Sequence, residues 1–518
     1  MTKSQIPLDE TNAFSAIFLD YLAQKQGLAT FYGLFPSVEN AGLMASKRQF
    51  DKRHRAILVD AISQQYQDIP FKEAVLSNLD LLKAENTFTI TTGHQLNLAT
   101  GPMYVVLKLI STINAAKALA LKFPQYHFVP IYWMATEDHD FEEINHFNYL
   151  GKTITWQTTQ TGAVGKFIVE SLESMFPDVN EIPAMVKEAY QEGLTLAKAT
   201  QKLVHALLGK YGLICLDADQ KALKELFVPI MKDEIVFGKA SLKVKETIEA
   251  LKAKGYKSQV NPRGINLFYL EHNVRERIEK QGDEYVVLNT ALKFKEEELL
   301  ELLSSHPEKF SPNVVLRPLY QCTILPDIAT VGGPSELAYW LQLKSLFDTY
   351  AVSFPLLMPR DFALVATNAQ QTKLEKIGIE VKDLFQDQAS LNKLILDKVD
   401  HNHFNLTHEM SFLTQINDSL LQKVHAIDPT LNATVNAEMT KIAKGLNDLE
   451  KKITKALERK NETTFNQVFN IKSKLFPKEG LQERHDNFFN FQLMHPTMIG
   501  DLVENLASFD FKLNILII

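Results

Sequence analysis

Short apolar segments with the character of β-strands alternate with helical segments over a large part of this chain. TFTITTG (87–93) precedes the helical stretch GPMYVVLKLISTINAAKALALKF, and HFVPIYWMA (127–135) follows it. GLICLDAD (212–219) precedes a second helical stretch, while NVVLRPLYQCTIL (313–325) and FPLLMP (354–359) have the composition of further strands. Apolar strands interleaved with helices predict a mostly parallel sheet covered by helices on both faces. We therefore expect an α/β fold.

Two regions interrupt this alternation with short β-like pieces and turns, and we interpret them as insertions into the core. The resulting division has seven parts: N-terminal helices with the first half of the core (1–150), a first insertion (151–195), a continuation of the core (196–240), a second insertion (241–307), the second half of the core (308–370), a helical arm (371–475) and a return to the core (476–518).

The arm is predicted from apolar residues at three- and four-residue spacing, the pattern of two long helices packed along a seam. The first series is Leu374, Ile377, Val381, Leu384, Leu391 and Ile395, and the second is Val435, Met439, Ile442, Leu446, Leu449, Ile453 and Leu457. Pro429 supplies a break between the two helices. The pattern predicts an antiparallel helical coiled-coil arm, and it leaves open whether the seam is filled within one chain or between two.

Composition narrows the classes of partner. The net charge is −7 and no block of basic residues occurs, which argues against nucleic acid as the main partner. The two cysteines, Cys215 and Cys322, cannot form a disulfide framework or a CxxC metal site. The N-terminus has no signal-peptide pattern, and no apolar run approaches the roughly 20 residues of a membrane span. We expect a cytoplasmic protein without a membrane partner.

Polar residues gather where two of the predicted strands end. TTGHQLNLATGP (91–102) contains neither of the two common glycine-rich phosphate loops. A turn between a strand and a helix is nevertheless where α/β sheets bind ligands, and free N–H groups there attract anions. We take Gly93, Gln95 and Asn97 as substrate-binding candidates and His94 as a catalytic candidate. The alternative is that His94 only caps the turn.

TEDHDFEEINH (136–146) follows the second strand and is rich in acids and histidine, which suit a general base, a cation pocket or a metal site. The HExxH zinc motif is absent, and we predict no metal. Asp138 and His139 are catalytic candidates, and Glu137 and Asp140 are substrate-binding candidates. An acidic first turn of a helix would explain the later acids without function.

Two further segments complete the set of candidates. LRPLYQ and VGGPSELAYW supply an arginine for an anion, a tight glycine turn and an aromatic wall, although core packing explains such aromatics equally well. These substrate-binding candidates are Arg317, Gln321, Gly332, Gly333, Glu336 and Tyr339. PKEGLQERHDNF (477–488) is a basic turn that binds phosphate or clasps the arm to the core. These cofactor-binding candidates are Lys478, Gly480, Gln482 and Arg484.

Taken together, the segments resemble the BshC family of bacillithiol biosynthesis, the cysteine-adding enzymes. The runs that carry the resemblance are TTGHQLNLATGPMYVVLKLIS, VPIYWMATEDHDFEEI, SPNVVLRPLYQCTILPDIATVGGPSELAYWLQLK and PKEGLQER, in family order over most of the chain. The resemblance implies a Rossmann-like core related to class I aminoacyl-tRNA synthetases, with connecting-peptide insertions. It also implies a homodimer supported by the coiled-coil arm.

The resemblance further implies a ligase that adds L-cysteine to the amino group of glucosaminyl-malate, and ATP or ADP as a bound nucleotide. The synthetase motif HIGH would fall on Thr91 to His94, so its first histidine is replaced by Thr91, and no KMSKS equivalent follows PLLMPRD. In the resulting hypothesis Asp138 or His139 deprotonates the attacking ammonium, or Asp138 instead holds the cysteine amine, and Arg317 pairs with the malate carboxylates. The alternatives are a nucleotidyl- or acyl-transferase with another amine substrate and a non-catalytic coiled-coil scaffold.

Overall fold

The computed structural model describes residues 1–176, 182–399 and 405–518, which form two compact units. Met1–Val365 and Gly480–Leu516 belong to the first unit, and Ala366–Glu479 form the second. The predicted first insertion and the predicted arm include residues 177–181 and 400–404, which lie outside the described part of the chain.

The core of the first unit is a sheet of five parallel strands. These are β2 (Thr87–His94), β3 (His127–Met134), β6 (Ile214–Asp217), β12 (Asp327–Gly332) and β13 (Leu356–Pro359). Their order across the sheet is β13-β12-β2-β3-β6, and each neighbouring pair is parallel. The chain therefore winds in one direction from β2 through β3 to β6 and in the other from β12 to β13. This is the doubly wound order of a Rossmann-like core, as predicted.

The long helix α5 (Met103–Lys122) connects β2 to β3 and packs against both strands. Nearly all of its first fourteen residues are buried, because its apolar side chains face the sheet and neighbouring helices. By length and composition α5 is the one helix in the described residues that meets the criteria for a membrane span, with 72% of its apolar window buried inside the protein. The expectation that no apolar run approaches that length was therefore wrong.

Helices surround this sheet, and α2, α3, α9 and α15 pack directly on its strands. The further helices of the first unit are α1 (Ala16–Leu22), α2 (Val38–Lys47), α3 (Lys52–Gln65), α4 (Glu73–Leu81), α6 (Phe141–Ile144), α7 (Leu172–Met175), α8 (Ala184–Ala189), α9 (Leu196–Leu208), α10 (Lys221–Glu225), α11 (Val228–Phe237), α12 (Lys239–Lys252), α13 (Glu296–Ser305), α15 (Pro334–Trp340), α16 (Lys344–Thr349), α22 (Phe488–Met494) and α23 (Met498–Asn505). The chain's first and last strands share a small second sheet, ordered β1 (Thr2–Pro7), β15 (Lys512–Ile517) and β14 (Phe362–Ala366).

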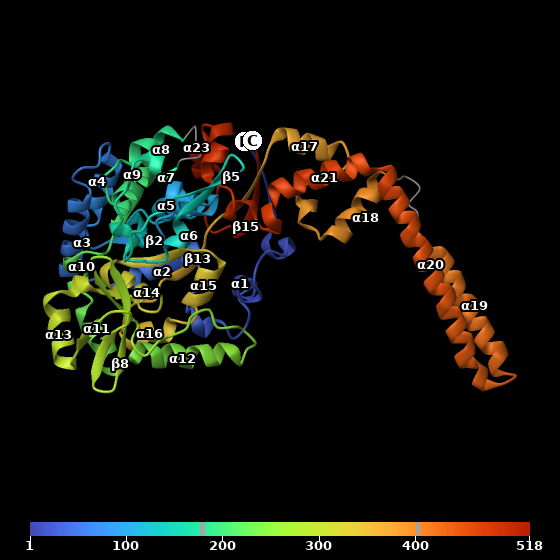
Figure 1. Ribbon diagram of the computed structural model, residues 1–518, viewed down its shortest axis with the longest axis horizontal. Helices are drawn as coiled ribbons and strands as arrows, with labels where there is room; N and C mark the ends of the chain where they lie inside the picture. The colour runs from blue at the N-terminus through green and yellow to red at the C-terminus, as the bar shows by residue number, and fades with distance from the viewer. Residues whose placement is uncertain (177–181, 400–404) are drawn as a thin grey trace. The chain divides into compact units, whose positions relative to one another are not determined.

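The insertions contain β-structure, as their composition predicted. In the first, β5 (Lys152–Thr155) pairs in a hairpin with β4 (His146–Tyr149), which lies just before the predicted boundary. The second contributes four strands of an antiparallel sheet beside α11 and α13 (Figure 1), in the order β10-β9-β8-β7-β11, and β11 lies just after the predicted boundary. Its strands are β7 (Leu267–Glu271), β8 (Val274–Gln281), β9 (Glu284–Val287), β10 (Lys293–Phe294) and β11 (Phe310–Pro312).

One predicted strand is a helix instead. Residues 313–325 contain α14 (Arg317–Ile324), and the strand of this region is β12, which begins only at Asp327. The Asn313 side chain accepts hydrogen bonds from the backbone N–H groups of Val315 and Leu316. Pro318 lies in the first turn of α14. The N-cap residue Leu316 makes no side-chain hydrogen bond to the helix, but a turn capped by asparagine and followed by proline still favours a helix start. The apolar run concealed this pattern.

The second unit contains the predicted hairpin, formed by α19 (Thr407–His425) and α20 (Asn432–Lys460) with Pro429 in the turn between them. Figure 1 shows these two helices side by side. The prediction that the 374–395 series forms one of the two long helices was wrong. Gly378, with φ of 79°, ends that stretch after α17, so the chain there is divided. The other helices are α17 (Asn368–Glu375), α18 (Gln388–Val399) and α21 (Glu462–Leu475).

Candidate active site at the ends of the parallel strands

The point at which the winding direction reverses lies between β2 and β12, and open α/β sheets bind ligands in the crevice there. Thr91 of β2 is the register partner of Thr330 of β12, so the ends of these two strands lie at the same edge. The predicted residues Gly93 and His94 end β2, and Gly332 ends β12. The structure thus brings together two of the segments selected from the sequence.

A buried lysine joins these strand ends. Lys108 of α5 is 1% exposed, and its Nζ donates to Gly93 O at 2.6 Å and to the two Glu336 carboxylate oxygens at 2.7 and 2.8 Å. Burial lowers the pKa of Lys108, and the Glu336 carboxylate partly opposes that shift. Glu336 also accepts from the Gly333 N–H at 2.9 Å. The predicted substrate ligand Glu336 is therefore engaged in holding the crevice together.

Arg317 of α14 lies against the bare backbone of Gly93. A Cβ atom on Gly93 would be 3.3 Å from a terminal nitrogen of Arg317, so a larger residue would displace the guanidinium. That guanidinium donates to Gln321 Oε1 at 2.9 Å and to the Tyr339 hydroxyl at 3.3 Å, and it lies 5.9 Å from the centre of the Trp133 ring. Among the described residues no carboxylate forms an ion pair with Arg317. It is a half-buried cation suited to an anionic ligand.

The environment of His94 is also positively charged. Its ring packs edge-on against Tyr104, whose hydroxyl lies 3.4 Å from His94 Nε2. Burial, together with the nearby charges of Lys108 and Arg360, holds the pKa of His94 well below its usual value. The imidazole is therefore neutral at physiological pH. It can exchange a hydrogen bond with a ligand but contributes no positive charge of its own.

The turn after His94 is strained and is held from outside. Ala99 and Thr100 both have positive φ, 47° and 68°, which non-glycine residues adopt only at a cost of about 1–3 kcal/mol. Asn487, from the C-terminal segment, donates from Nδ2 to Ala99 O at 2.7 Å and to Gly101 O at 2.6 Å. The Met103 N–H at the start of α5 donates to a backbone carbonyl of the same segment at 2.8 Å. This N–H is therefore engaged, which weakens the expectation of a free anion-binding helix start.

Asp138 and His139 lie beyond β3, beside an arginine from the second insertion. Arg275 of β8 is 5% exposed, and it lies 3.5 Å from Asp138 Oδ1 and 2.6 Å from His139 Nδ1. A guanidinium only donates, so His139 Nδ1 must accept and the ring proton resides on Nε2. Gln95 donates to Asp138 Oδ2 at 3.5 Å and to Glu143 at 2.9 Å. Gln95 thus links the first two predicted segments.

The other acids of this segment have different surroundings. Glu137 forms an ion pair at 2.6 Å with the buried Lys224 of α10, which also binds Asp219. Burial raises the pKa of Glu137, and the Lys224 charge opposes the shift. Asp140 is exposed and lies 3.6 Å from His139 Nε2. Asn97, at 7% exposure, lies inside the turn beside Gly101. A direct role in ligand binding is therefore less favoured for Glu137 and Asn97 than for Arg317.

The predicted cofactor-binding residues have different surroundings. Gln482 is 5% exposed, and its amide accepts from the Val365 N–H at 2.9 Å and donates to Val365 O at 3.1 Å. Arg484 is exposed and lies over the Tyr104 ring at 5.6 Å, within the first unit. Lys478 belongs to the second unit and has φ of 52°. The Gln482 amide is therefore engaged with the backbone, whereas Arg484 adds a cation beside the crevice.

Sequence reasoning missed three cations of this region: Lys108, Arg275 and Arg360. Lys108 carried a usable signal, because it is the only charged residue in an apolar stretch of fourteen that begins at Met103. Arg275 lies in a strand in which five of the eight residues are charged, so nothing in the sequence distinguishes it. Arg360 pairs with Glu483 at 2.6 Å, with both side chains almost wholly buried, and this contact joins segments 123 residues apart.

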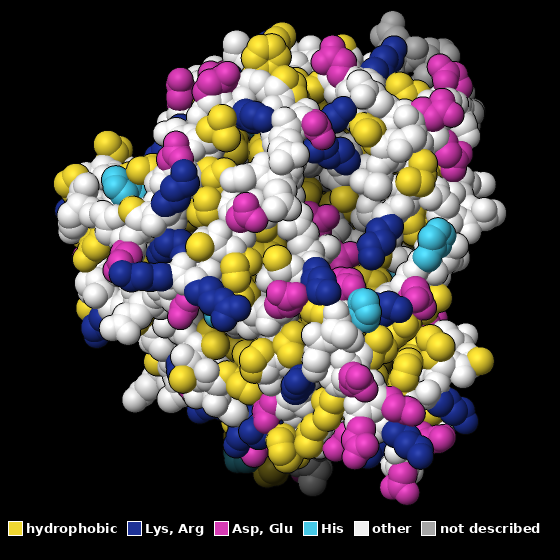
Figure 2. Space-filling view, turned by 90° about the vertical axis from the view of Figure 1, so that its left-hand side faces the viewer, with side chains coloured by type: hydrophobic (Ala, Val, Ile, Leu, Met, Phe, Trp, Pro, Cys, Tyr) yellow, Lys and Arg dark blue, Asp and Glu magenta, His cyan; other side chains and the backbone are white. Residues whose placement is uncertain are grey.

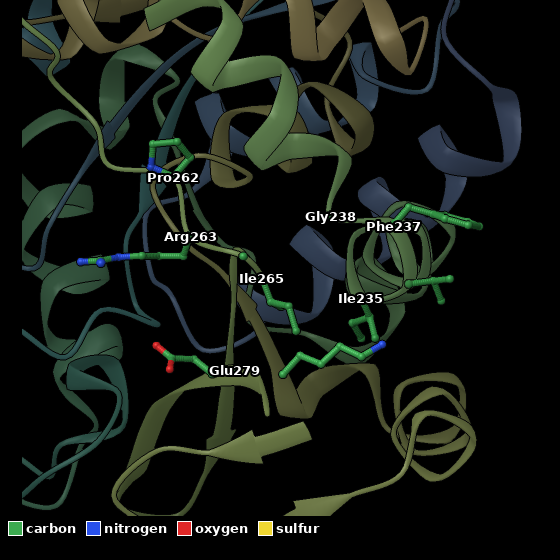
Figure 3. A pocket seen from close by; sticks show the side chains of 10 residues that line it. Ile235, Phe237, Gly238, Pro262, Arg263, Ile265 and Glu279 are labelled. Carbon is green, nitrogen blue, oxygen red and sulfur yellow. The ribbon is translucent and has the colours of Figure 1, made fainter. Parts of the chain in front are cut away.

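A separate cavity of about 600 Å³ lies in the second insertion, between the end of α11, the loop at Pro262–Ile265 and β8 (Figure 3). None of the predicted site residues lines it. On the face of the molecule drawn in Figure 2, basic side chains are interspersed with acidic ones. Within the described residues no group of three or more His, Cys, Asp or Glu side chains is placed to hold a metal ion.

Two family models match adjoining parts of the chain. The description "Bacillithiol biosynthesis BshC, N-terminal Rossmann-like domain" covers residues 1–361, and "Bacillithiol biosynthesis BshC, C-terminal coiled-coil domain" covers residues 363–518. Both descriptions agree with the observed sheet order and with the helical second unit.

Several relatives match over nearly the full length. A protein of Cytophaga hutchinsonii is 41% identical over 509 residues, 98% of each chain, and one of Flavobacterium johnsoniae is 41% identical over 518 residues, also 98% of each. A third, of Flavobacterium psychrophilum, is 42% identical over 496 residues, 93% of each chain. All three carry the name "Putative cysteine ligase BshC".

Proposed function

Because this chain belongs to the BshC family of bacillithiol biosynthesis, we propose that it is a ligase that joins the carboxyl group of L-cysteine to the amino group of glucosaminyl-malate. The observation that carries the substrate assignment is the Arg317 guanidinium, which faces the crevice between β2 and β12 without a carboxylate partner among the described residues. A dicarboxylate such as malate suits an arginine that presents several N–H donors in one plane.

In this proposal the malate and glucosamine parts of glucosaminyl-malate contact different residues of the crevice. Arg317, oriented by Tyr339, binds the malate carboxylates, while the glucosamine amine points toward Asp138. The neutral His94 and Gln95 lie between these positions and supply hydrogen bonds to the sugar or to the carbonyl oxygen under attack. A Cβ atom on Gly332 would lie 2.9 Å from Leu337 Cδ2 and 3.1 Å from Glu336 Oε2, so Gly332 lets the turn pack closely against the helix that follows it.

Asp138 is the better candidate for the base. The attacking amine must lose protons as its nitrogen forms the amide bond, so an acceptor is needed beside it. The Nδ1 lone pair of His139 is already used by Arg275 at 2.6 Å, and the other ring nitrogen carries the proton. Asp138 keeps oxygen lone pairs available, because each of its two oxygens has only one distant partner, at 3.5 Å.

Activation of the cysteine carboxyl is not supplied by these residues. An amine attacks a free carboxylate poorly, so a nucleotide or an acyl donor is required by the chemistry. Of the four residues predicted to bind ATP or ADP, Gln482 has its amide engaged with the backbone of Val365. A nucleotide therefore remains a proposed co-substrate without assigned ligands.

We further propose that the functional form of the protein is a cytoplasmic homodimer, in which a second copy packs against the α19–α20 hairpin. No residue of α19 is buried, and α20 buries only Met439. Large apolar side chains are left exposed on this hairpin, among them Phe412, Ile416, Ile442 and Leu449. Exposed apolar residues at helical spacing favour a partner helix.

The test uses purified protein with glucosaminyl-malate, L-cysteine and ATP, and bacillithiol is measured by mass spectrometry. The wild type should form bacillithiol, and Asp138→Asn should reduce its rate at least about 100-fold, the lower range for loss of a general base. Glu142→Gln is the matched control, since Glu142 is an exposed acid in the first turn of α6. The proposed reaction would be excluded if the wild type formed no product while the relative from Cytophaga hutchinsonii formed it under the same conditions.

A further inference from the structure

A line of hydrogen bonds runs from the crevice into the interior of the first unit. Arg317 donates to Gln321 Oε1 at 2.9 Å, and Gln321 donates from Nε2 to Asp327 Oδ2 at 2.7 Å. Gln321 and Asp327 are both fully buried. Thr89 and Thr91 of β2 donate their hydroxyl groups to Asp327 Oδ1. The cation of the crevice is thus connected to a buried carboxyl group that no ligand can reach.

The charges at the two ends allow the Gln321 amide only one orientation. A guanidinium can only donate, and an ionised carboxylate can only accept. Burial raises the pKa of Asp327 to about 6, against the opposing effect of its three hydrogen-bond donors, so it is ionised at neutral pH. The amide must therefore turn its oxygen to Arg317 and its nitrogen to Asp327.

This arrangement fixes the plane of the guanidinium. One terminal nitrogen of Arg317 is held by Gln321, and the other by the Tyr339 hydroxyl at 3.3 Å. Partners on two nitrogens determine the orientation of a planar group, and the other N–H groups stay available for a ligand. A freely rotating arginine would have to lose side-chain entropy when it binds a carboxylate, whereas this one has lost it on folding.

We propose that Gln321 and Asp327 are positioning residues that hold Arg317 in the orientation that binds the carboxylates of the amine substrate. This inference rests on the proposed function, in which Arg317 pairs with the malate carboxylates. Neither residue touches substrate. The position at which class I synthetases carry the first histidine of their motif is occupied by Thr91, whose hydroxyl is one of the groups that hold Asp327.

The first test is Gln321→Met, which removes both polar ends of the amide with an unbranched side chain of similar length. KM for glucosaminyl-malate should rise about tenfold or more, while kcat and KM for cysteine stay within about twofold, because one oriented hydrogen bond to a charged group is worth roughly 1.5–3 kcal/mol. Thr323→Val is the matched control on the same helix, since the Thr323 hydroxyl bonds only to Leu319 O of its own helix, at 2.7 Å. A Gln321→Met enzyme with the wild-type KM would overturn the inference.

A double-mutant cycle separates positioning from a general structural role. If Gln321 acts through Arg317, then Arg317→Met with Gln321→Met should bind glucosaminyl-malate no more weakly than Arg317→Met alone. Additive losses would show that Gln321 contributes independently of Arg317, and the inference would be wrong. Gln321→Glu gives the same test with an isosteric side chain if the methionine variant does not fold. Its carboxylate neutralises Arg317, so KM for glucosaminyl-malate should rise here too.

Calorimetric titration with glucosaminyl-malate distinguishes failure of the positioning role from failure of the proposed function. A wild type that binds and converts this substrate, together with an unaffected Gln321→Met variant, overturns the positioning role and leaves the proposed function standing. A wild type that neither binds nor converts it overturns both.

Discussion

Removal of the Glu336 charge should destabilise the first unit through Lys108. Lys108 Nζ is 1% exposed and is held by Glu336 and by Gly93 O, so Glu336→Gln leaves a buried ammonium with neutral acceptors only. Removing one partner of a buried ion pair costs about 3–5 kcal/mol. Because the Glu336 side chain is 30% exposed, we expect the lower end of that range, about 3 kcal/mol.

Tryptophan fluorescence measures this loss for the first unit alone, since Trp133, Trp156 and Trp340 all lie in it. With a denaturant slope of about 3 kcal/mol/M, the urea midpoint should fall by about 1 M. The difference in stability between the wild type and Glu336→Gln should become smaller between pH 7 and pH 10. Burial lowers the pKa of Lys108, so its buried, unpaired charge is lost from the variant as the pH rises.

The double variant Lys108→Met with Glu336→Gln provides the decisive comparison. It retains no unpaired charge, so it should be more stable than Glu336→Gln alone. Equal midpoints for the wild type and Glu336→Gln, or a double variant that is the least stable of all, would refute the reasoning.

Three further predictions concern the surroundings of the crevice. Gly93→Ala places a Cβ atom 3.3 Å from the Arg317 guanidinium, so KM for glucosaminyl-malate should rise about tenfold while the urea midpoint changes little; an unchanged KM would contradict the contact. Asn487→Ala removes two buried hydrogen bonds from the turn at Ala99 and the hydrogen bond that caps α22, which together should cost about 2–3 kcal/mol in urea unfolding, and a loss below about 1 kcal/mol would show that the turn does not depend on Asn487. Burial raises the pKa of Asp361 to about 6, above its unfolded value, so wild-type stability falls as the pH rises through that value. Asp361→Asn lacks this ionisation and should gain thermal stability relative to the wild type between pH 5 and pH 7.5, whereas a constant difference would exclude the titration.

Three strands of the core, β3, β6 and β13, could be predicted because each is a mostly apolar run buried in the sheet, and β2 could be predicted because its apolar residues alternate with threonine. The strand β12 was not predicted, because the strand expected in that region was placed on residues 313–325. The turns at Gly93 and Gly332 were recognised for a related reason, since small and polar residues follow such runs only where the chain leaves the sheet. The same rule failed for α14, where the apolar run belongs to a buried helix and the capping side chain of Asn313 lies before it. Periodicity alone does not separate buried strands from buried helices over so short a stretch.

The partners within the candidate site could not be predicted in this way. Arg275 reaches His139 across 136 positions of sequence, and Arg360 reaches Glu483 across 123. Such pairs form because the sheet order and the insertions bring distant segments together. A single sequence shows the charged residues but not which of them meet. Arg317 and Gln321 were both selected for their residue types, and the sequence did not show that Gln321 is buried with its amide bonded to Arg317 and Asp327.

The C-terminal segment has a consequence for how this protein is made. Glu483 neutralises Arg360, and Asn487 holds the turn at Ala99, yet both are synthesised only after the whole helical arm. While the ribosome adds those last residues, the nascent core has an uncompensated buried arginine and an unsupported active-site turn. The final strand, β15, then pairs with the first strand, β1. A chain that stops after the arm lacks Glu483 and Asn487, so we expect Arg360 to be unpaired and the turn at Ala99 to lose two of its hydrogen bonds in such a chain.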